Sequence, residues 1–289
     1  PKKPYALTKE EEDIMERLER AFENCEKLQR HMHFLLNKGG LYKVYNGNLL
    51  YHGCVPLKED GNLKSVRIFG RAYKGKGLYE VLESYVRKGF YAMDPKEKER
   101  GKDIMWYIWL SENSPLFGKD KMATFERYFL SEKETHKEKK NPYYLLLEDE
   151  KVVEKILKEF GLENEDAHII NGHVPVKCKD GENPVKCGGK VLVIDGGFSK
   201  AYQKETGIAG YTLIYNSYGL ILAAHKPFES TEAAIEKESD IHSDSTVVKR
   251  TLERKKVEDT DVGKELKEQI SDLEVLLAAY RSGVIAERM

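Results

Sequence analysis

Two short segments each place a histidine beside a glycine at the end of an apolar run. They are Leu49–Leu57, "LLYHGCVPL", and Ile169–Lys177, "IINGHVPVK". Both apolar runs are typical of buried strands, so His52 and His173 are predicted at strand ends. Neutral imidazole is a good ligand for manganese, iron, zinc or cobalt, and a neighbouring glycine lets a metal or phosphate approach the backbone closely.

A histidine at a strand end often has only a structural role, and that alternative stays open for each of the two. The matching context of His52 and His173 favours a shared role as metal ligands. A strand is a rigid support, and the loop that follows it leaves room for a substrate.

The elements around His52 follow from turn and capping residues. Thr8 and Glu11 fit a capping box at the start of an amphipathic helix that Gly39-Gly40 would end. "LYKVY", the pair Asn46-Gly47 and "LLYHGCV" then predict a β-hairpin with His52 late in its second strand.

The rest of the chain predicts an α+β protein. A second hairpin is expected at Asp60-Gly61 and a helix over 78–88. "DIMWYIWL" is bulky enough for a buried strand or a short helix, and "DEKVVEKILKEFG" is an amphipathic helix. "AHIINGH", "KVLVIDGGF", "AGYTLIYNS" and "GLILAAHKPF" are four strand-like runs. We divide the chain into a helical segment (1–38), a central domain (39–229) and a charged, mostly helical tail (230–289).

Composition excludes several classes of partner. The 289 residues carry a formal net charge of −1, which gives no basic field for nucleic acid. No apolar run reaches the roughly 20 residues of a membrane span. Four cysteines are few for this length and predict free thiols in a reducing, cytoplasmic compartment. Cys178 and Cys187 match no common zinc spacing.

A third segment, "GKVLVIDGGFS", ends a strand in Ile-Asp-Gly-Gly soon after the second histidine turn. This order resembles the C-terminal half of a calcineurin-like metallophosphoesterase, an αββα fold in which a β-sandwich is flanked by helices. Longer blocks resemble the bacterial class III fructose-1,6-bisphosphatases: "LQRHMHFLLNKGGLYKVYNGNLLYHGCVPL", "MWYIWLSENSPLFGKDKMATFERYF", "THKEKKNPYY", "INGHVPVK" and "GENPVKCGGKVLVIDGGFSKAYQKETGIAGYTLIYNSYGL".

The resemblance implies a function and a cofactor. It implies hydrolysis of the 1-phosphate of fructose 1,6-bisphosphate to fructose 6-phosphate and phosphate in gluconeogenesis. It also implies a binuclear Mn²⁺ centre, with Mg²⁺ or another divalent cation as an alternative, and His52 and His173 among its ligands. We further expect a homo-oligomer.

Cations near the histidines are expected to bind phosphate. Related metallophosphatases often carry such a cation in the loop between the two histidine turns, where this chain has Lys119 and Lys121. Lys177, Lys186 and Lys200 are further candidates, each with a surface role as the alternative. Asp195 could order the turn after its strand.

The family's other ligands come from Asp-x-His, Gly-Asp-x-x-Asp-Arg-Gly and Gly-Asn-His-Glu turns, and we expect these in an N-terminal half that this chain lacks. Gly47-Asn48, for example, is followed by Leu-Leu instead of His-Glu, and the first residue is Pro1 instead of methionine. The residue that acts as general acid is therefore unknown from this sequence and is expected in that half.

Two other functions stay open. The first is a protein or dinucleoside-polyphosphate phosphatase with the same metal core, because the histidine turns are shared with those groups. The second is a non-catalytic subunit made from half an enzyme. The long blocks quoted above favour the sugar bisphosphatase.

Overall fold

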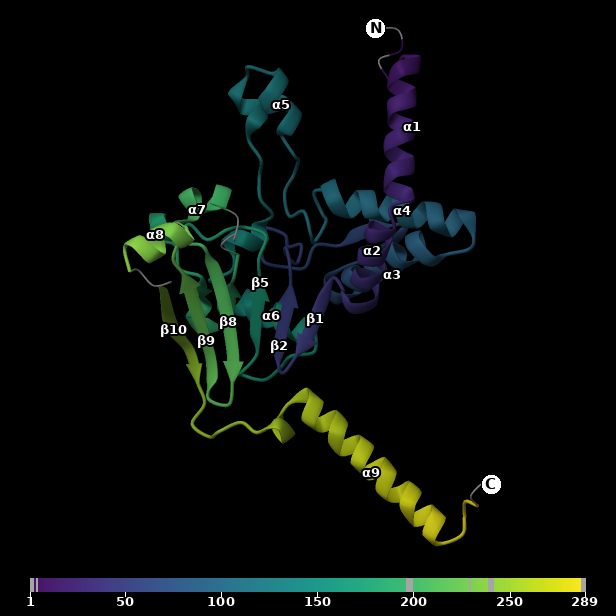
Figure 1. Ribbon diagram of the computed structural model, residues 1–289, viewed down its shortest axis with the longest axis vertical. Coiled ribbons are helices and arrows are strands. Elements are labelled where there is room, and N and C mark those ends of the chain that lie inside the picture. Colours follow the sequence, from purple (N-terminus) through teal and green to yellow (C-terminus); the bar gives the residue numbers. More distant parts are fainter. Residues whose placement is uncertain (1–2, 4, 196–199, 229, 239–241, 287–289) are drawn as a thin grey trace.

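A computed structural model describes residues 3, 5–195, 200–228, 230–238 and 242–286. Its centre is a five-stranded sheet (Figure 1) in the order β1-β2-β5-β7-β6. The strands are β1 (Tyr42–Tyr45), β2 (Asn48–Tyr51), β5 (His168–Asn171), β6 (Val185–Lys186) and β7 (Val191–Val193). The expectation of a fold that combines sheets and helices is confirmed, and the chain has a mixed α/β fold.

The three middle strands run parallel. Leu50 pairs with Ile170, and Ile170 pairs with Leu192. The carboxyl ends of β2, β5 and β7 therefore meet at one edge of the sheet. β1 joins β2 through Asn46-Gly47, both with positive φ (48° and 76°), as the predicted hairpin requires. His52 lies directly after β2 instead of within it.

A second, antiparallel sheet packs on one face of the first. It consists of β8 (Gly210–Asn216), β9 (Gly219–His225) and β10 (Ser243–Arg250). Leu220 of β9 packs against Ile170 and Leu192 of the central strands, and all three side chains are buried. Two apolar sheet faces packed in this way make the β-sandwich that positions the site.

Helix α6 (Glu150–Glu159) covers the opposite face of the central sheet. Asp149 caps its first turn, and Val153 and Ile156 are buried in one cluster with Leu49 and Ile169 of the sheet. This is the amphipathic helix that the sequence predicts before Gly161.

A separate apolar cluster forms under α3 (Gly75–Tyr91), α4 (Pro95–Leu110) and the hairpin of β3 (Val66–Ile68) and β4 (Arg71–Tyr73). "DIMWYIWL" forms the last turns of α4. Of the two alternatives for this segment, the helix is confirmed and the buried strand is wrong. Trp106 and Trp109 remain 61% and 58% exposed on the helix surface.

The N-terminal segment forms two helices, α1 (Lys9–Glu23) and α2 (Glu26–Lys38), where the sequence predicted one. The capping box of Thr8 and Glu11 is confirmed, and α2 ends at Gly39. No described residue of α1 is buried, and the helix extends away from the sheets (Figure 1).

Between β4 and β5 the chain also forms an arm that extends from the body near the site (Figure 1). A bridge between Lys119 and Lys140 closes its base. The arm contains α5 (Thr124–Phe129) and a 3₁₀ turn, η1 (Lys133–His136), and a second turn, η2 (Pro142–Leu145), follows it.

The C-terminal segment differs from its prediction in one element. The segment contains the helices α8 (Thr231–Glu236) and α9 (Asp261–Arg281), but Ser243–Arg250 is strand β10. Since β10 pairs with β9, the boundary drawn at residue 230 falls inside one sheet. The alternation of apolar and polar residues is weak in "SDSTVVKR", so its strand character depends on the neighbouring β9.

The remaining short elements are η3 (Cys178–Asp180), η4 (Cys187–Gly189), α7 (Lys200–Thr206) and η5 (Val257–Asp259).

Two global expectations concern the chain's environment. Every helix in the described residues is too short or too polar to cross a lipid bilayer. All four cysteines are free thiols, as the sequence predicted.

His168, at the start of β5, provides a test of the core. It is 7% exposed, and burial is the main cause that lowers its pKa from 6.5 to about 4, with the charge of Lys249 second. Between these values the unfolded chain binds a proton that the folded chain does not, so folding stability should fall as pH falls from about 6.5 towards 4.

We therefore expect His168→Gln to reduce the loss of melting temperature between pH 7 and pH 4.5 by at least about 2 °C relative to the unsubstituted chain. Circular dichroism melts across this pH range measure it. Parallel pH profiles for the two proteins would contradict the assignment.

Candidate metal centre

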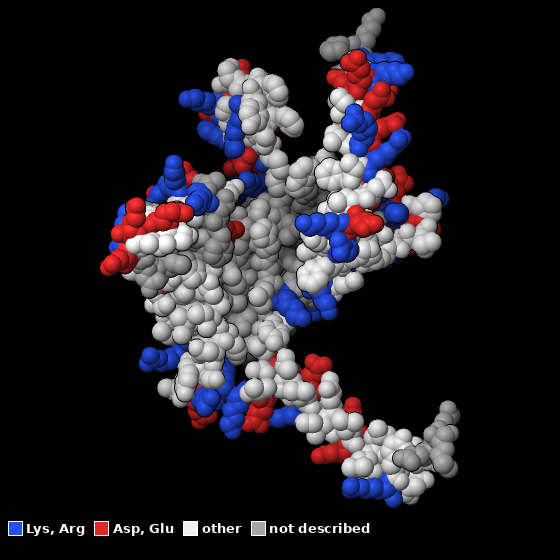
Figure 2. Space-filling model, in the orientation of Figure 1, with Lys and Arg blue, Asp and Glu red and all other residues white. Residues whose placement is uncertain are grey.

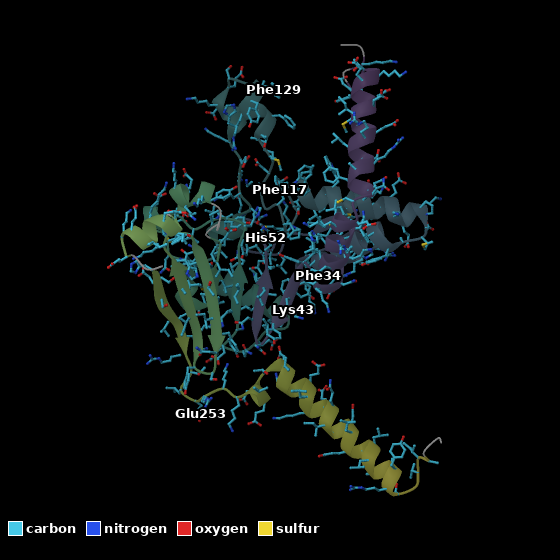
Figure 3. The ribbon with its side chains drawn as sticks, viewed as in Figure 1. Phe34, Lys43, His52, Phe117, Phe129 and Glu253 are labelled. Carbon is cyan, nitrogen blue, oxygen red and sulfur yellow. The ribbon has the colours of Figure 1, made fainter. Side chains whose placement is uncertain are left out.

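The parallel strands bring His52 and His173 together although 121 positions separate them. His52 Nε2 lies 3.1 Å from His173 Nδ1, and the two rings meet edge to face with centroids 5.0 Å apart. Figure 3 places His52 above the ends of the central strands, close to Phe117. Two imidazole nitrogens this close can both bind one cation, since metal–nitrogen bonds are about 2.0–2.1 Å long.

Backbone contacts join the two histidine turns. The N–H of Gly172 donates to the carbonyl of His52 over 2.9 Å, and Asn171 Nδ2 donates to the carbonyl of Gly53 over 3.2 Å. His173 has φ of +70°, a left-handed conformation that few side chains with a Cβ adopt. Strained backbone of this kind concentrates at functional sites.

The tautomer of His173 follows from its second nitrogen. His173 Nε2 lies 2.9 Å from the carbonyl oxygen of Phe117, which can only accept, so Nε2 carries the hydrogen. Nδ1 then carries a lone pair that faces His52 and accepts the 3.1 Å hydrogen bond from its Nε2. Histidines that bind metals usually donate their other N–H to a carbonyl or carboxylate in this way.

The surroundings of His173 favour its neutral form. Burial is the largest cause that lowers its pKa, and the charges of His52 and Lys119 act in the same direction. The hydrogen bond to Phe117 and the charge of Asp195 oppose them. The lowered pKa keeps the imidazole neutral at physiological pH, which is the form that ligates metals.

Asp195 and Asn171 add oxygen atoms beside the histidines. Asp195 follows β7, the third parallel strand, and its carboxylate would lie 3.5 Å from a Cβ placed on Gly172. Asn171 is 2% exposed, and its Oδ1 has no hydrogen-bond partner. Asn171 was not among the site residues predicted from the sequence, although its position beside Gly172 at a strand end was the available signal.

The described residues do not complete a metal site. Within them, no group of three His, Cys, Asp or Glu side chains lies close enough to hold an ion. The pair of histidines therefore has the donor chemistry of a partial site. Two divalent cations would need further carboxylates to balance four positive charges.

One expectation about missing motifs is wrong. An Asp-x-His triplet does occur, as Asp166-Ala167-His168. It lies at the opposite end of β5 from His173, and Asp166 forms an ion pair with Lys249. The triplet therefore contributes nothing to the histidine pair. A second triplet, 240–242, lies partly outside the described residues.

Lys119 and Lys121 lie at the base of the arm. The positive charge of Lys119 reaches His173, and its Nζ forms a 2.9 Å ion pair with Glu138, which is mostly buried. Lys121 Nζ instead donates to the carbonyl of Thr135 over 2.6 Å and holds the arm together.

The other candidate lysines lie on separate elements. Lys177 is exposed after the His173 turn, and its backbone N–H donates to Glu182. Lys186 is on the edge strand β6, 3.8 Å from Glu148. Lys200 begins α7.

A hollow of about 1180 Å³ opens beside the histidine pair. Its polar lining includes His52, Asn171 and Asp195, which form its polar rim, and residues 37–43 also line it. Apolar side chains of the central strands line it, among them Leu50 and Ile170. Figure 2 shows this part of the surface as a concave and largely uncharged region.

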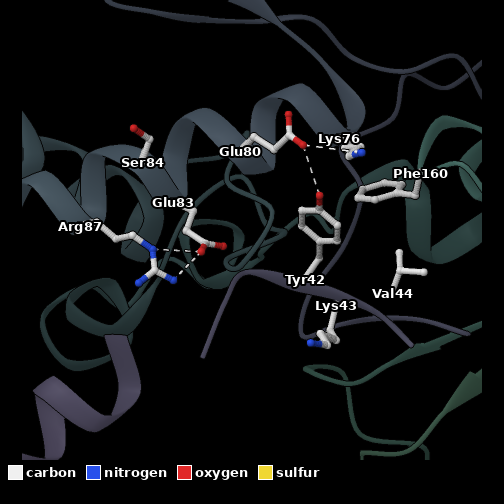
Figure 4. A pocket seen from close by; sticks show the side chains of 9 residues that line it. All are labelled: Tyr42, Lys43, Val44, Lys76, Glu80, Glu83, Ser84, Arg87 and Phe160. Carbon is white, nitrogen blue, oxygen red and sulfur yellow. Dashed lines mark hydrogen bonds and ion pairs between the residues drawn. The ribbon is translucent and has the colours of Figure 1, made fainter. Parts of the chain in front are cut away.

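A smaller cavity of about 690 Å³ lies between β1 and α3 (Figure 4). Four of its five charged side chains pair with one another: Arg87 with Glu83 at 2.6 Å, and Lys76 with Glu80 at 3.7 Å. Tyr42 also donates to Glu80, and Lys43 is the fifth charged side chain. This cavity does not include the histidine pair, so the hollow is the better candidate for the substrate site.

Comparison with known proteins gives one consistent family. The family described as Firmicute fructose-1,6-bisphosphatase matches residues 1–282. A protein of Alkaliphilus metalliredigens named fructose-1,6-bisphosphatase class 3 is 56% identical over 291 positions, which cover 100% of this chain and 44% of that protein. Proteins of the same name from Clostridium novyi and Clostridium botulinum are 56% and 57% identical, with 44% and 43% of their lengths covered.

No solved structure matches the chain. The chain thus spans less than half the length of the curated relatives that it matches.

Gly53 and Gly172 offer a matched test of how tightly the site is built. A Cβ on Gly53 would collide with the carbonyl of Pro115, in the loop that carries Phe117 against His173. A Cβ on Gly172 would make only ordinary contacts, at 3.5 Å from Asp195. We expect Gly53→Ala to lower the free energy of unfolding by about 1–3 kcal/mol.

Gly172→Ala should change the free energy of unfolding by less than about 1 kcal/mol. Urea denaturation of the two variants measures the difference. Equal stabilities would contradict the close approach of Gly53 to the Pro115 loop.

Proposed function

Because the chain belongs to the Firmicute fructose-1,6-bisphosphatase family, we propose that it is part of an enzyme that hydrolyses the 1-phosphate of fructose 1,6-bisphosphate. The products would be fructose 6-phosphate and inorganic phosphate. The names of the relatives select this substrate, and they favour it over a phosphoprotein or a dinucleoside polyphosphate. The free thiols suit a cytoplasmic enzyme.

The observation that carries the proposal is the lone pair of His173 Nδ1, which faces His52 Nε2 at 3.1 Å. We assign these two nitrogens as ligands of a binuclear divalent-metal centre, with Mn²⁺ as the proposed ion and Mg²⁺ as the alternative. Bound metals would supply positive charge to the phosphate oxygens and lower the pKa of a bound water.

The chain's own residues would hold and orient these groups. Phe117 fixes the ring of His173 through its carbonyl, and the contact from Gly172 to His52 keeps the two turns in register. Lys119 adds positive charge next to His173, where negative charge on a transferring phosphoryl group would need balance. The carboxylate of Asp195 would keep nearby water or metal in place.

We also propose the calcineurin-like αββα architecture for the complete enzyme. Here two sheets pack face to face, with α6 on the outer face of the central sheet. The relatives' additional length is sufficient to supply further helices and strands.

The part of the relatives that this chain does not match would bind in the hollow beside His52. Its lining combines apolar side chains with the polar rim of the site, and a surface of this kind is costly to leave exposed to water. A segment bound there would add the carboxylate ligands, and a general acid to give a proton to the departing sugar oxygen.

The test compares the 289-residue chain with a longer polypeptide that includes the family's remaining segment. We expect the chain alone to bind Mn²⁺ weakly and to release no phosphate from fructose 1,6-bisphosphate, because its described residues offer a pair of imidazole nitrogens and no group of three metal-binding side chains. The longer protein should do both. Equilibrium dialysis and a phosphate-release assay measure the two properties.

In the longer protein, His52→Ala should remove bound manganese and nearly all turnover, whereas His136→Ala, on the exposed arm, should keep both. Robust metal-dependent turnover by the verified 289-residue chain would refute the missing-part proposal. Normal manganese content in His52→Ala would refute the ligand assignment.

Lys119 gives an independent prediction. In the longer protein, Lys119→Ala should raise KM or lower kcat about tenfold or more, about 1.4 kcal/mol, through loss of a phosphate-binding cation. It should also raise the pKa of His173, because the positive charge of Lys119 lowers it. Steady-state kinetics and an NMR titration of the metal-free protein measure the two effects.

Lys121→Ala is the comparison, since it removes a neighbouring lysine that holds the arm. If both variants kept wild-type kinetics and the titration of His173 did not move, the arm base would have only a surface role.

A further inference from the structure

The last helix, α9, extends from the body by one end (Figure 1). The first turn of α9 is fixed to the body. The backbone N–H of Asn46 donates to the Asp261 carboxylate over 2.6 Å, and the backbone N–H of Asp261 donates to Asn46 Oδ1 over 2.9 Å. Thr260 is the N-cap, and its hydroxyl oxygen accepts from the N–H of Gly263. Beyond the first turn, α9 has no buried residue. Its 21 residues correspond to a helix about 32 Å long.

A continuous apolar stripe runs along this exposed helix. Leu266, Ile270, Leu273, Leu277 and Tyr280 follow one another at steps of 4, 3, 4 and 3 residues, and their side chains are between 44% and 63% exposed. Alternating steps of 3 and 4 are the a and d positions of a coiled coil. We call these five residues the α9 stripe.

Charges beside the α9 stripe indicate the direction of pairing. Lys267 and Glu274 occupy successive e positions. When a helix pairs with an antiparallel copy of itself, so that Ile270 packs against Leu273 of the copy, Lys267 comes beside Glu274 of the copy. The two-fold symmetry forms this ion pair twice.

A parallel pair would lack these ion pairs and would also bring the two bodies close together. It would set the e positions against g positions of the copy, and these are Val262, Gln269 and Leu276, which carry no charge. It would also place the two bodies at the same end of the helix pair, because α9 joins its body at the N-terminal end (Figure 1). Antiparallel pairing separates the bodies by the length of the helix.

We propose that α9 is the dimerisation element of this protein and that its stripe binds the stripe of a second copy in antiparallel orientation. The occupant is identified by self-complementarity: both the apolar positions and the charges of one α9 match those of a reversed α9. This proposal is independent of the catalytic one, since α9 is remote from His52 (Figure 3).

Sedimentation equilibrium of the 289-residue chain over a range of concentrations tests the proposal. We expect a monomer–dimer equilibrium for the unsubstituted chain. Leu273→Glu should weaken it at least about a hundredfold, because two leucines lose their burial in each dimer.

Val275→Glu is the matched control, since Val275 is 68% exposed on the opposite side of the same helix. It should dimerise as the unsubstituted chain does. Circular dichroism confirms that both variants fold.

A charge exchange tests the orientation. Glu274→Lys should weaken the dimer about tenfold, because Lys267 of each copy would then face a lysine at position 274 of the other. Adding Lys267→Glu should restore the dimer. Lys267 also lies 3.3 Å from Glu258 of its own chain, so all these variants are compared in a Glu258→Gln background.

A monomer at all concentrations would overturn the proposal. So would a dimer that Leu273→Glu leaves intact, since its contact would lie elsewhere, for example at the hollow. Failure of the charge exchange to restore the dimer would overturn the antiparallel register.

Discussion

The site depends on the parallel pairing of β2 with β5. Leu49 and Leu50 pair with Ile169 and Ile170, and this register brings both strand ends to one height in the sheet. The turn beyond each strand then carries its histidine to the same point. A shift of one residue would send the side chains of β5 to opposite faces and separate His173 from His52. The buried contacts of β5 with both neighbouring layers prevent such a shift.

The chemistry of the histidine pair depends on the residues that surround His173. The Phe117 carbonyl fixes which nitrogen of His173 carries the hydrogen, and burial keeps the ring neutral. Phe117 reaches this position because the backbone N–H of Cys54 donates to the carbonyl of Pro115 over 2.8 Å, which ties the loop of Phe117 to the His52 turn. These short-range contacts together therefore set the position, the tautomer and the charge of the His173 ring.

The body of this chain is well packed, but several of its surfaces have the character of interfaces. The hollow combines apolar and polar groups beside the site, α9 carries an uncovered stripe, and Phe125 and Phe129 stack on the exposed arm. Coverage of less than half of the relatives' length agrees with such surfaces. Assembly and catalysis would then use different faces of the molecule.

The sequence by itself determined many of the local elements and pointed to the two histidines as candidate metal ligands. Turn and capping residues such as Asn46, Gly47 and Thr8 predicted the hairpin and the first helix, and the two histidine turns predicted strand ends. These features depend on residues close in the chain. Strand β10 and the exposed surface of α4 required the tertiary structure, because a weak strand forms only beside β9 and burial depends on distant neighbours. The 3.1 Å approach of His52 to His173 was likewise decided by the parallel register across 121 positions.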